Sequence, residues 1–430
     1  MQGKIENISQ AKNFVFSTTY KGSSLGLERI RDLLARLGNP QDKLKFIHIS
    51  GTNGKGSTAA MLSSILVEAG YKTGLFTSPY IDCFTEMIQI DHRPISDDHL
   101  IALTNEMQAH LKTMKDKPTE FEIITALAFL NFYRQNCDIV VLEVGMGGRL
   151  DSTCVINSPE VAVITNIGMD HMEFLGDTIE EIAADEAGII KTGTVCISYP
   201  QIESVEQVIR HKCLEQGVKV VFADKIDAEE YTIPFLGQHQ LVNASVAINT
   251  INALRDQEWV IPEESLKQGL AKTKWPGRFE IMRHDPVFII DGAHNLQSVE
   301  MTANTLISLY PGKKITFLIG LLADKDYENI IKTLMPLAKE FLTVTPDSPR
   351  ALPAEVLAEH INDMGSTASS YNSIEEGVKQ ALAASNKDDI ICAVGSLHLI
   401  GRARKALGPV PTNENAYLRP IFPPLCVTSS

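Results

Sequence analysis

The stretch FIHISGTNGKGST, residues 46–58, decides how the chain begins to fold. Its first residues are mostly apolar or β-prone, which predicts a short strand. Three glycines then fall within six positions, and a lysine stands between the last two of them. A strand, a glycine-rich turn, a lysine and a helix form the arrangement that cradles phosphate groups, because glycines let backbone N–H groups approach phosphate oxygens closely. The predicted phosphate-binding residues are Gly51, Thr52, Asn53, Gly54, Lys55, Gly56, Ser57 and Thr58.

The loop departs from the standard phosphate-loop pattern at two positions. Ile49 stands where that pattern has its first glycine, and Gly56 stands where it has a Ser or Thr directly after the lysine. The hydroxyl is displaced to Ser57, so a bound magnesium ion needs an oxygen ligand from elsewhere in the chain. The alternative is a plain turn between strand and helix, which the lysine and the hydroxyls disfavour.

Composition narrows the class of protein. A chain of 430 residues is too long for one compact core, so two domains are expected. Lys and Arg total 39 against 53 Asp and Glu, a net charge of −14, which argues against a nucleic-acid partner but not against a small anion in a locally positive pocket. The start shows no signal peptide, no apolar run is long enough to span a membrane, and the seven scattered cysteines are typical of reduced thiols in a cytoplasmic protein.

Short apolar runs alternate with longer helical patterns, and such runs are typical of strands covered by helices on both faces. In the first part of the chain the expected strands are 45–49, 73–77, 138–144, 161–167 and 219–223. After a pause around residues 274–280, a second series is expected at 287–291, 315–320, 341–345 and 390–395.

This order predicts an α/β protein. Residues 1–283 are expected to form a phosphate-loop domain with a mostly parallel sheet and helices on both faces. Residues 284–408 are expected to form a smaller, Rossmann-like α/β domain, and the Pro-rich and polar residues 409–430 a loosely attached tail.

Six motifs, in their order along the chain, carry a resemblance to a known family. They are GTNGKGST (51–58), TSPYI (77–81), EVGMGGRLDST (143–153), DHMEFLGDTIEEIA (170–183), WPGRFE (275–280) and DGAHN (291–295). The sequence resembles the folylpolyglutamate synthases and dihydrofolate synthases of the Mur ligase superfamily from about residue 20 to residue 405. Six ordered motifs are much more specific than a single glycine loop.

The resemblance implies ATP and two Mg²⁺ ions as cofactors. It assigns metal binding to Ser78, Glu143 and His171, each of which lies at or after the end of an expected strand, where parallel sheets bind ligands. Taken singly, each residue has a structural alternative: Ser78 as a turn residue, Glu143 as a buried carboxylate and His171 as a core imidazole.

The resemblance also implies ATP contacts from the later part of the chain. These are Asn243, Arg278 and Asp291, of which Arg278 suits the phosphates because a guanidinium binds oxygens in pairs. The residues implied in catalysis are Lys55, Glu143, His171, Arg278 and His294. For His294, a structural role in the segment DGAHN remains an equal alternative.

The implied substrate contacts are less specific. The segment PTEFEIITALAF resembles the pterin side of the family's site, which makes Thr119, Glu120, Phe121 and Glu122 candidates. The two glutamates could instead cap or flank a helix. Leu150, Asp151 and Ser152 resemble further substrate contacts, and Lys325 could meet a carboxylate or simply be solvated.

The sequence departs from the family pattern at several positions. Glu186 replaces a lysine that is carbamylated in the family and assists magnesium binding. Our hypothesis is that Glu186, with the same charge on a shorter arm, reaches the second magnesium directly or through a water. The alternative is that it only faces solvent. Four further departures, which leave the identity of the acceptor open, are Thr85, Met87, Cys154 and His398.

The expected activity is ATP-dependent ligation of L-glutamate to folate or dihydropteroate through an acyl phosphate, by a monomer. One alternative is a Mur-type ligase acting on another carboxylate. Another is a nucleotide-binding module without ligase activity, which the presence of Lys55, Glu143 and Arg278 disfavours.

Overall fold

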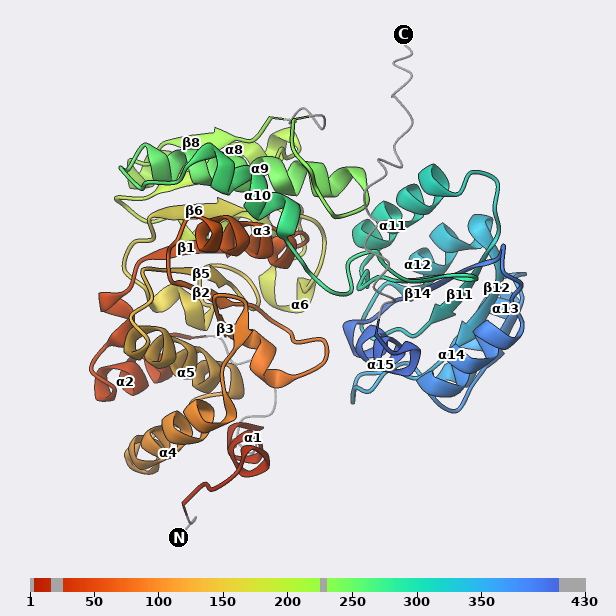
Figure 1. Ribbon diagram of the computed structural model, residues 1–430, viewed down its shortest axis with the longest axis horizontal. Coiled ribbons are helices and arrows are strands. Elements are labelled where there is room, and N and C mark those ends of the chain that lie inside the picture. Colours follow the sequence, from red (N-terminus) through yellow and green to blue (C-terminus); the bar gives the residue numbers. More distant parts are fainter. Residues whose placement is uncertain (1–3, 17–25, 225–229, 410–430) are drawn as a thin grey trace. The chain divides into compact units, whose positions relative to one another are not determined.

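The computed structural model describes residues 4–16, 26–224 and 230–409, so the expected tail beyond residue 409 lies outside the described residues. The chain divides into two compact units (Figure 1). Unit 1 comprises Met1–Ile233 with Gln240–Lys274, and unit 2 comprises Pro234–His239 with Trp275–Ser430.

Unit 1 is built on a sheet of eight described strands in the order β4-β3-β2-β5-β1-β6-β7-β8. From β2 to β8 every pairing is parallel, and β3 and β4 add an antiparallel edge. The strands are β1 (Phe46–Ser50), β2 (Thr73–Phe76), β3 (Ile88–Ile90), β4 (Arg93–Pro94), β5 (Ile139–Glu143), β6 (Val161–Ile164), β7 (Val195–Ser198) and β8 (Val220–Phe222).

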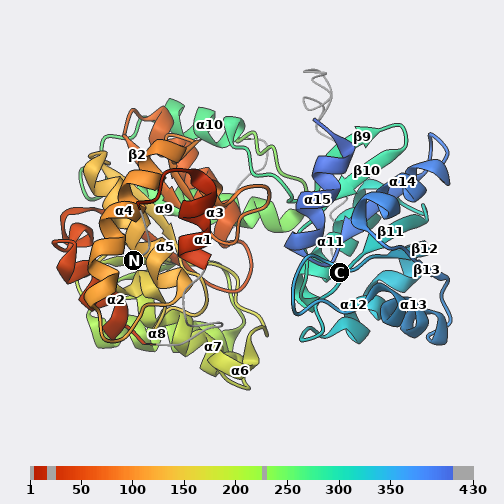
Figure 2. The same ribbon diagram turned by 90° about the horizontal axis from the view of Figure 1, so that it is seen from below.

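Helices cover both faces of this sheet (Figure 1). The helix α3 packs against α10 so closely that a Cβ on Gly269 would lie 2.4 Å from the Cα of Ile65. Figure 2 shows α1 beside α4, where the two helices contact each other. The helices are α1 (Ile8–Phe16), α2 (Glu28–Arg36), α3 (Lys55–Glu68), α4 (Asp97–Thr113), α5 (Glu120–Arg134), α6 (Met172–Leu175), α7 (Ile179–Glu186), α8 (Glu203–Gln216), α9 (Gln238–Arg255) and α10 (Glu263–Lys272).

Unit 2 has a second sheet, of six described strands in the order β13-β12-β11-β14-β10-β9. Its pairings are parallel except for the β9–β10 hairpin. The strands are β9 (Glu280–His284), β10 (Val287–Ile290), β11 (Ile315–Ile319), β12 (Ala338–Thr343), β13 (Ala368–Ser370) and β14 (Ile390–Val394).

The helices of unit 2 form two layers around this sheet. The first three pack into one hydrophobic core and the last two into another, on opposite faces (Figure 2). They are α11 (Leu296–Leu309), α12 (Tyr327–Leu334), α13 (Ala354–Asp363), α14 (Ile374–Ala383) and α15 (Leu397–Leu407).

The α/β class, the mostly parallel sheets and the nine expected strands agree with the structure. Sequence analysis missed β3, β4, β7, β9 and β13. Four of these are very short or carry polar residues and so lack a continuous apolar run, whereas β7, with the sequence VCIS, has three consecutive apolar residues and could have been predicted. The boundary expected at residues 283/284 falls inside the β9–β10 hairpin. Residues 275–283 belong to unit 2, because β9 hydrogen-bonds to β10.

None of the helices in the described ranges is both long and apolar enough to cross a bilayer.

Candidate nucleotide and metal site

The glycine loop follows β1 and has the backbone shape that its glycines permit. Gly51 has φ of +122° and Gly54 has φ of +93°, a region that residues with a Cβ rarely adopt. A Cβ on Gly51 would lie 2.4 Å from Thr165 Oγ1, and a Cβ on Gly54 would lie 2.6 Å from Asn243 Oδ1. Both glycines are therefore required by conformation and by close packing.

The loop is tied by hydrogen bonds to the segment that follows β6. The N–H groups of Thr52 and Asn53 donate to the carbonyl oxygen of Asn166 at 2.9 and 3.1 Å. The Thr52 hydroxyl donates to the Gly168 carbonyl and accepts from the Gly168 N–H, both at 3.0 Å. These bonds fix the loop against the segment that leads to His171, which itself has φ of +51°.

Lys55 begins α3 and folds back over the loop. Its ammonium group donates to the carbonyl oxygens of Gly51, at 2.5 Å, and Thr52, at 3.3 Å. The ammonium group therefore lies on the loop that precedes α3, and the first N–H groups of that helix have no acceptors within it. A helix N-terminus and a lysine at one place form a site for an anion such as a phosphate group.

Asn243, for which the resemblance implies an ATP contact, lies beside the loop, where its Oδ1 is close to Gly54. Its amide donates to Gln240 Oε1 at 3.1 Å, and the Gln240 amide donates to the Ser57 hydroxyl at 3.4 Å. Gln240 was missed by sequence analysis, although it stands three positions before Asn243 on the same helix and so faces the same way. The buried Thr58 hydroxyl makes no hydrogen bond within the described residues, which leaves a polar atom next to the loop that a polar ligand could satisfy.

Ser78 and Glu143 lie close together at the carboxyl ends of two neighbouring parallel strands of the unit 1 sheet. Ser78 follows β2 and Glu143 ends β5, and these two strands are neighbours. The Ser78 N–H donates to Glu143 Oε2 at 3.3 Å, and Glu143 is almost fully buried. A hydroxyl and a carboxylate beside a phosphate loop fit Mg²⁺, which is usually held by one or two carboxylates together with phosphate oxygens and water.

His171 and Glu186 are the other two proposed metal ligands, and neither belongs to a preformed cluster of metal-binding side chains within the described residues. Within the described ranges, no group of three or more His, Cys, Asp or Glu side chains is close enough to hold a metal ion. His171 comes after β6, next to β1 in the sheet, and Glu186 is buried at the end of α7. The alternative that Glu186 faces solvent is therefore wrong.

Two of the candidate substrate contacts on the pterin side, Thr119 and Glu122, form the cap of a helix. Thr119 is the N-cap of α5, and Thr119 and Glu122 exchange the two hydrogen bonds of a capping box. Glu122 also accepts from Arg29 Nε at 3.0 Å and is nearly inaccessible. Phe121 packs on Phe76 with ring centroids 5.9 Å apart. Glu120 is half-buried, and this burial raises the pKa of its carboxyl.

The Asp151 carboxylate accepts hydrogen bonds from residues that are close to it in the chain. One carboxylate oxygen accepts from the N–H groups of Gly145 and Met146, at 3.0 and 3.2 Å. The other accepts from the N–H and the hydroxyl of Thr153, at 2.9 and 2.6 Å. Burial raises the pKa of Asp151, and these hydrogen bonds oppose the rise. The side chain thus holds the turn after Glu143 in place. Its neighbours Leu150 and Ser152 are half-buried and buried.

A buried histidine, which sequence analysis missed, extends this network. His48 lies inside β1 and its Nε2 is 2.8 Å from the Thr153 hydroxyl. Because that hydroxyl donates to Asp151, it accepts from His48. Burial, together with the charge of Lys191, lowers the pKa of His48 to about 3. The one signal in the sequence that could have identified His48 is its position in the expected strand that ends at the glycine loop.

Unit 2 carries its own polar cluster at the carboxyl end of β10. Asp291 accepts from the N–H of Phe279 at 3.1 Å and from the N–H of Ala293 at 2.8 Å. A Cβ on Gly292 would lie 2.3 Å from Arg278 Nη1, so the guanidinium lies directly on that glycine. Burial raises the pKa of Asp291 to about 6, and the Arg278 charge opposes this rise.

His294 lies two residues beyond Gly292 and bonds to it. Its Nδ1 is 2.8 Å from the Gly292 carbonyl oxygen, which makes Nδ1 the donor. Lys325 lies in the loop after β11, and His398 lies in the first turn of α15, which follows β14. The strands β11 and β14 continue the sheet beside β10, so these residues all follow the carboxyl ends of neighbouring strands of unit 2.

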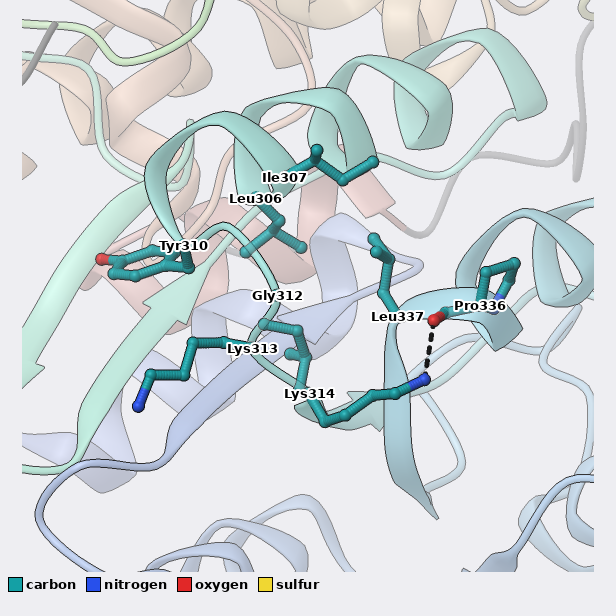
Figure 3. Close-up of a pocket in the computed structure, with 9 residues that line it drawn as sticks. Leu306, Ile307, Tyr310, Gly312, Lys313, Lys314, Pro336 and Leu337 are labelled. Atoms are coloured by element: carbon teal, nitrogen blue, oxygen red, sulfur yellow. Dashed lines mark hydrogen bonds between the residues drawn. The ribbon is translucent and has the colours of Figure 1, made fainter. Parts of the chain in front are cut away.

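A pocket of about 200 Å³ lies at the opposite edge of the same sheet, where β11 begins (Figure 3). Its wall combines apolar side chains of α11 with Lys313 and Lys314, and the Lys314 ammonium donates to the Pro336 carbonyl oxygen at 2.9 Å. None of the residues assigned to the nucleotide, the metal or the substrates lines it.

Comparison with known proteins places the chain in a family. Residues 49–197 match the Mur ligase middle domain, and residues 277–397 match the Mur ligase glutamate ligase domain. The chain is 37% identical over 427 residues to the dihydrofolate synthase/folylpolyglutamate synthase of Bacillus subtilis, an alignment that covers 92% of this chain and 98% of that protein. It is 34% identical over 411 residues to the folylpolyglutamate synthase of Lacticaseibacillus casei, covering 88% and 94%.

Solved structures agree with this assignment. Escherichia coli FolC in complex with DHPP and ADP has a TM-score of 0.85 and 28% identity, over 95% of this chain and 99% of that one. The Mycobacterium tuberculosis folylpolyglutamate synthase complexed with ADP and AMPPCP has a TM-score of 0.82 and 30% identity, over 89% and 95%. A Yersinia pestis bifunctional folylpolyglutamate synthase/dihydrofolate synthase complexed with AMPPNP and Mn has a TM-score of 0.84 and 26% identity, over 95% and 99%. The chain therefore belongs to the folylpolyglutamate synthase/dihydrofolate synthase family of Mur ligases, as its ordered motifs predict.

Proposed function

We propose that the chain is an ATP-dependent ligase that joins L-glutamate to folate or dihydropteroate by an amide bond. The observation that carries the proposal is the convergence of three loops at one edge of the unit 1 sheet. Ser78 follows β2, Glu143 is the last residue of β5 and the phosphate loop follows β1, and these three strands are adjacent in the order β2-β5-β1. Ligands of parallel sheets bind at this edge.

The proposed reaction has two steps. A carboxylate oxygen of the pterin acid attacks the γ-phosphorus of ATP, and the bond between that phosphorus and the bridging oxygen breaks to release ADP. The amine nitrogen of glutamate then attacks the acyl carbon, the carbon–oxygen bond to phosphate breaks, and inorganic phosphate leaves with loss of a proton. Phosphoryl transfer depends on positioning and charge neutralisation, so no nucleophilic side chain is required.

The chain's own residues supply this positioning. The N-terminus of α3 and Lys55 bind the phosphate oxygens, and Asn243 orients the loop through its contact with Gly54. Ser78, Glu143 and His171 are proposed to hold Mg²⁺, which when bound neutralises phosphate charge. Arg278, Asp291 and His294 are proposed ATP or phosphate contacts on the basis of the resemblance. Thr119 to Glu122 and Leu150 to Ser152 stay proposed as parts of the substrate region.

The test is a substrate panel. Purified protein is incubated with ATP, Mg²⁺, L-glutamate and each pterin acid in turn, while phosphate release and product mass are followed. Phosphate release that requires both glutamate and a pterin acid supports the proposal. Release without any pterin acid would be ATP hydrolysis that is not coupled to ligation of a pterin acid, and it would contradict the proposal. Release that requires glutamate and a different, added carboxylic acid would instead support a Mur-type ligase for another carboxylate. ATP binding without glutamate-dependent release would support a nucleotide-binding module. The proposed monomeric state is tested on the same sample by light scattering, and the proposed cytoplasmic location by cell fractionation.

A further inference from the structure

Glu186 departs from the family pattern and lies under the phosphate loop. The residue is only 2% exposed, and it ends α7 directly beside the turn of residues 145–149. A Cβ on Gly148 would lie 2.3 Å from the Glu186 carbonyl oxygen, which shows how closely the two segments pack. A buried carboxylate needs hydrogen bonds or an opposite charge to remain ionised.

Two hydrogen bonds join Glu186 to the end of β1. Its Oε2 accepts from the Gly51 N–H at 3.1 Å. Its carbonyl oxygen accepts from the Ser50 hydroxyl at 2.9 Å. The contact is therefore made at the residues where the strand turns into the loop.

Gly51 is held from both sides as a result. Its N–H bonds to the Glu186 carboxylate, and its carbonyl oxygen accepts from the Lys55 ammonium. The Lys55 charge and the Gly51 N–H oppose the rise that burial causes in the pKa of Glu186. Gly51 also has the positive φ that gives the loop its shape. A carboxylate acceptor makes a stronger hydrogen bond than a neutral one.

We propose that Glu186 is a positioning residue that sets the orientation of the Gly51 peptide, and through it the phosphate loop, without binding the metal. This inference rests on nucleotide binding at that loop. The carboxylate belongs to the chain itself, so the anchor does not depend on carbamylation of a lysine. Glu186 stands at the sequence position of the family's lysine, and its proposed role is to hold the phosphate loop.

The experiment compares Glu186→Ala, Glu186→Gln and the wild type, with Glu180→Gln as a matched control on the exposed side of the same helix. ADP affinity is measured by calorimetry twice, once with EDTA and once with Mg²⁺. Hydrogen exchange of peptides that contain Gly51 is followed by mass spectrometry in the free proteins.

The expected result separates loop anchoring from metal binding. Glu186→Ala, which loses the acceptor, should bind ADP about tenfold more weakly even in EDTA and should exchange the Gly51 amide faster. Glu186→Gln keeps an acceptor oxygen and should stay within about threefold of the wild type. Glu180→Gln should match the wild type.

Two results would overturn the inference. One is unchanged metal-free ADP binding in Glu186→Ala together with a higher Mg²⁺ requirement in both variants, which would identify a metal ligand. The other is equal loss in Glu186→Ala and Glu186→Gln. If the wild type itself fails to bind ADP, the proposed function fails, and the exchange measurement alone decides whether Glu186 anchors Gly51.

Discussion

Gly54 and Asn243 are in such close contact that a Cβ on the glycine would lie 2.6 Å from the Asn243 Oδ1. The contact joins the N-terminus of α3 to α9, two elements that are far apart along the chain. It explains why the position before Lys55 is a glycine for two independent reasons, its φ of +93° and the lack of space.

The first prediction separates these two reasons. Gly54→Ala should lower the free energy of unfolding by more than about 2 kcal/mol, because backbone strain and a clash add together. Gly70→Ala is the matched control, since Gly70 has nearly the same φ, +89°, but nothing within 4 Å of its Cβ position. Denaturant titration should show a smaller loss for the control. Equal losses in the two variants would contradict a role for the Asn243 contact.

The second prediction concerns the charge on the loop. Lys55→Met should reduce kcat by about a hundredfold or more, because a preorganised positive group next to the transferred phosphoryl group is lost. Steady-state kinetics with saturating ATP measures the effect. Lys339→Met removes an exposed ion pair with Asp389, at 3.3 Å, and should leave kcat unchanged. Near-normal turnover of Lys55→Met would exclude Lys55 from catalysis.

The third prediction concerns the metal. EDTA should abolish turnover and Mg²⁺ should restore it. Glu143→Gln should raise the Mn²⁺ concentration needed for half-saturation of the ADP complex by about tenfold or more, because a charged oxygen ligand is lost. Electron paramagnetic resonance of free Mn²⁺ gives this value independently of turnover. The control is Glu206→Gln, a residue paired on the surface with Arg210. Unchanged Mn²⁺ binding would remove Glu143 from the metal site.

The fourth prediction follows from His48. Its folded pKa of about 3 lies below the usual value of 6.5, so between these pH values the unfolded chain binds a proton that the folded protein does not. The stability due to neutral His48 is complete above pH 6.5 and is lost as the pH falls toward 3, by up to about 1.4 kcal/mol per pH unit.

His48→Gln, which can still donate to Thr153, should therefore show a shallower loss of unfolding free energy between pH 6.5 and pH 4.5. Urea titrations at several pH values measure the slope for both proteins. The same slope in variant and wild type would mean that His48 does not account for the acid sensitivity.

Local signals in the sequence were enough for the class of fold and for the glycine loop. The glycine spacing at 51–56 predicts a phosphate loop because φ and close approach are set within a few residues. Apolar runs predict the central strands because strands covered on both faces have no polar side. The same argument fails for β9 and β13, whose sequences EIMRH and ASS include polar residues.

The partners of the site residues could not be predicted in this way. Nothing in the motif DST shows that the Asp151 carboxylate is filled by hydrogen bonds from Gly145, Met146 and Thr153, or that His48 completes that network. Likewise, the replacement of lysine by Glu186 was visible in the sequence, but its bond to the Gly51 N–H was not.

The amino-acid sequence by itself thus determined nine of the described strands, the loop after β1 and membership of a ligase family, because these depend on neighbouring residues and on the spacing of motifs. The tertiary structure alone decided which side chains are buried, which carboxylates are already bonded and which residues hold the loop. The physical reason is that burial and hydrogen bonding depend on residues such as Gly51 and Glu186, which are distant in the chain and meet only when the sheet and its helices pack together.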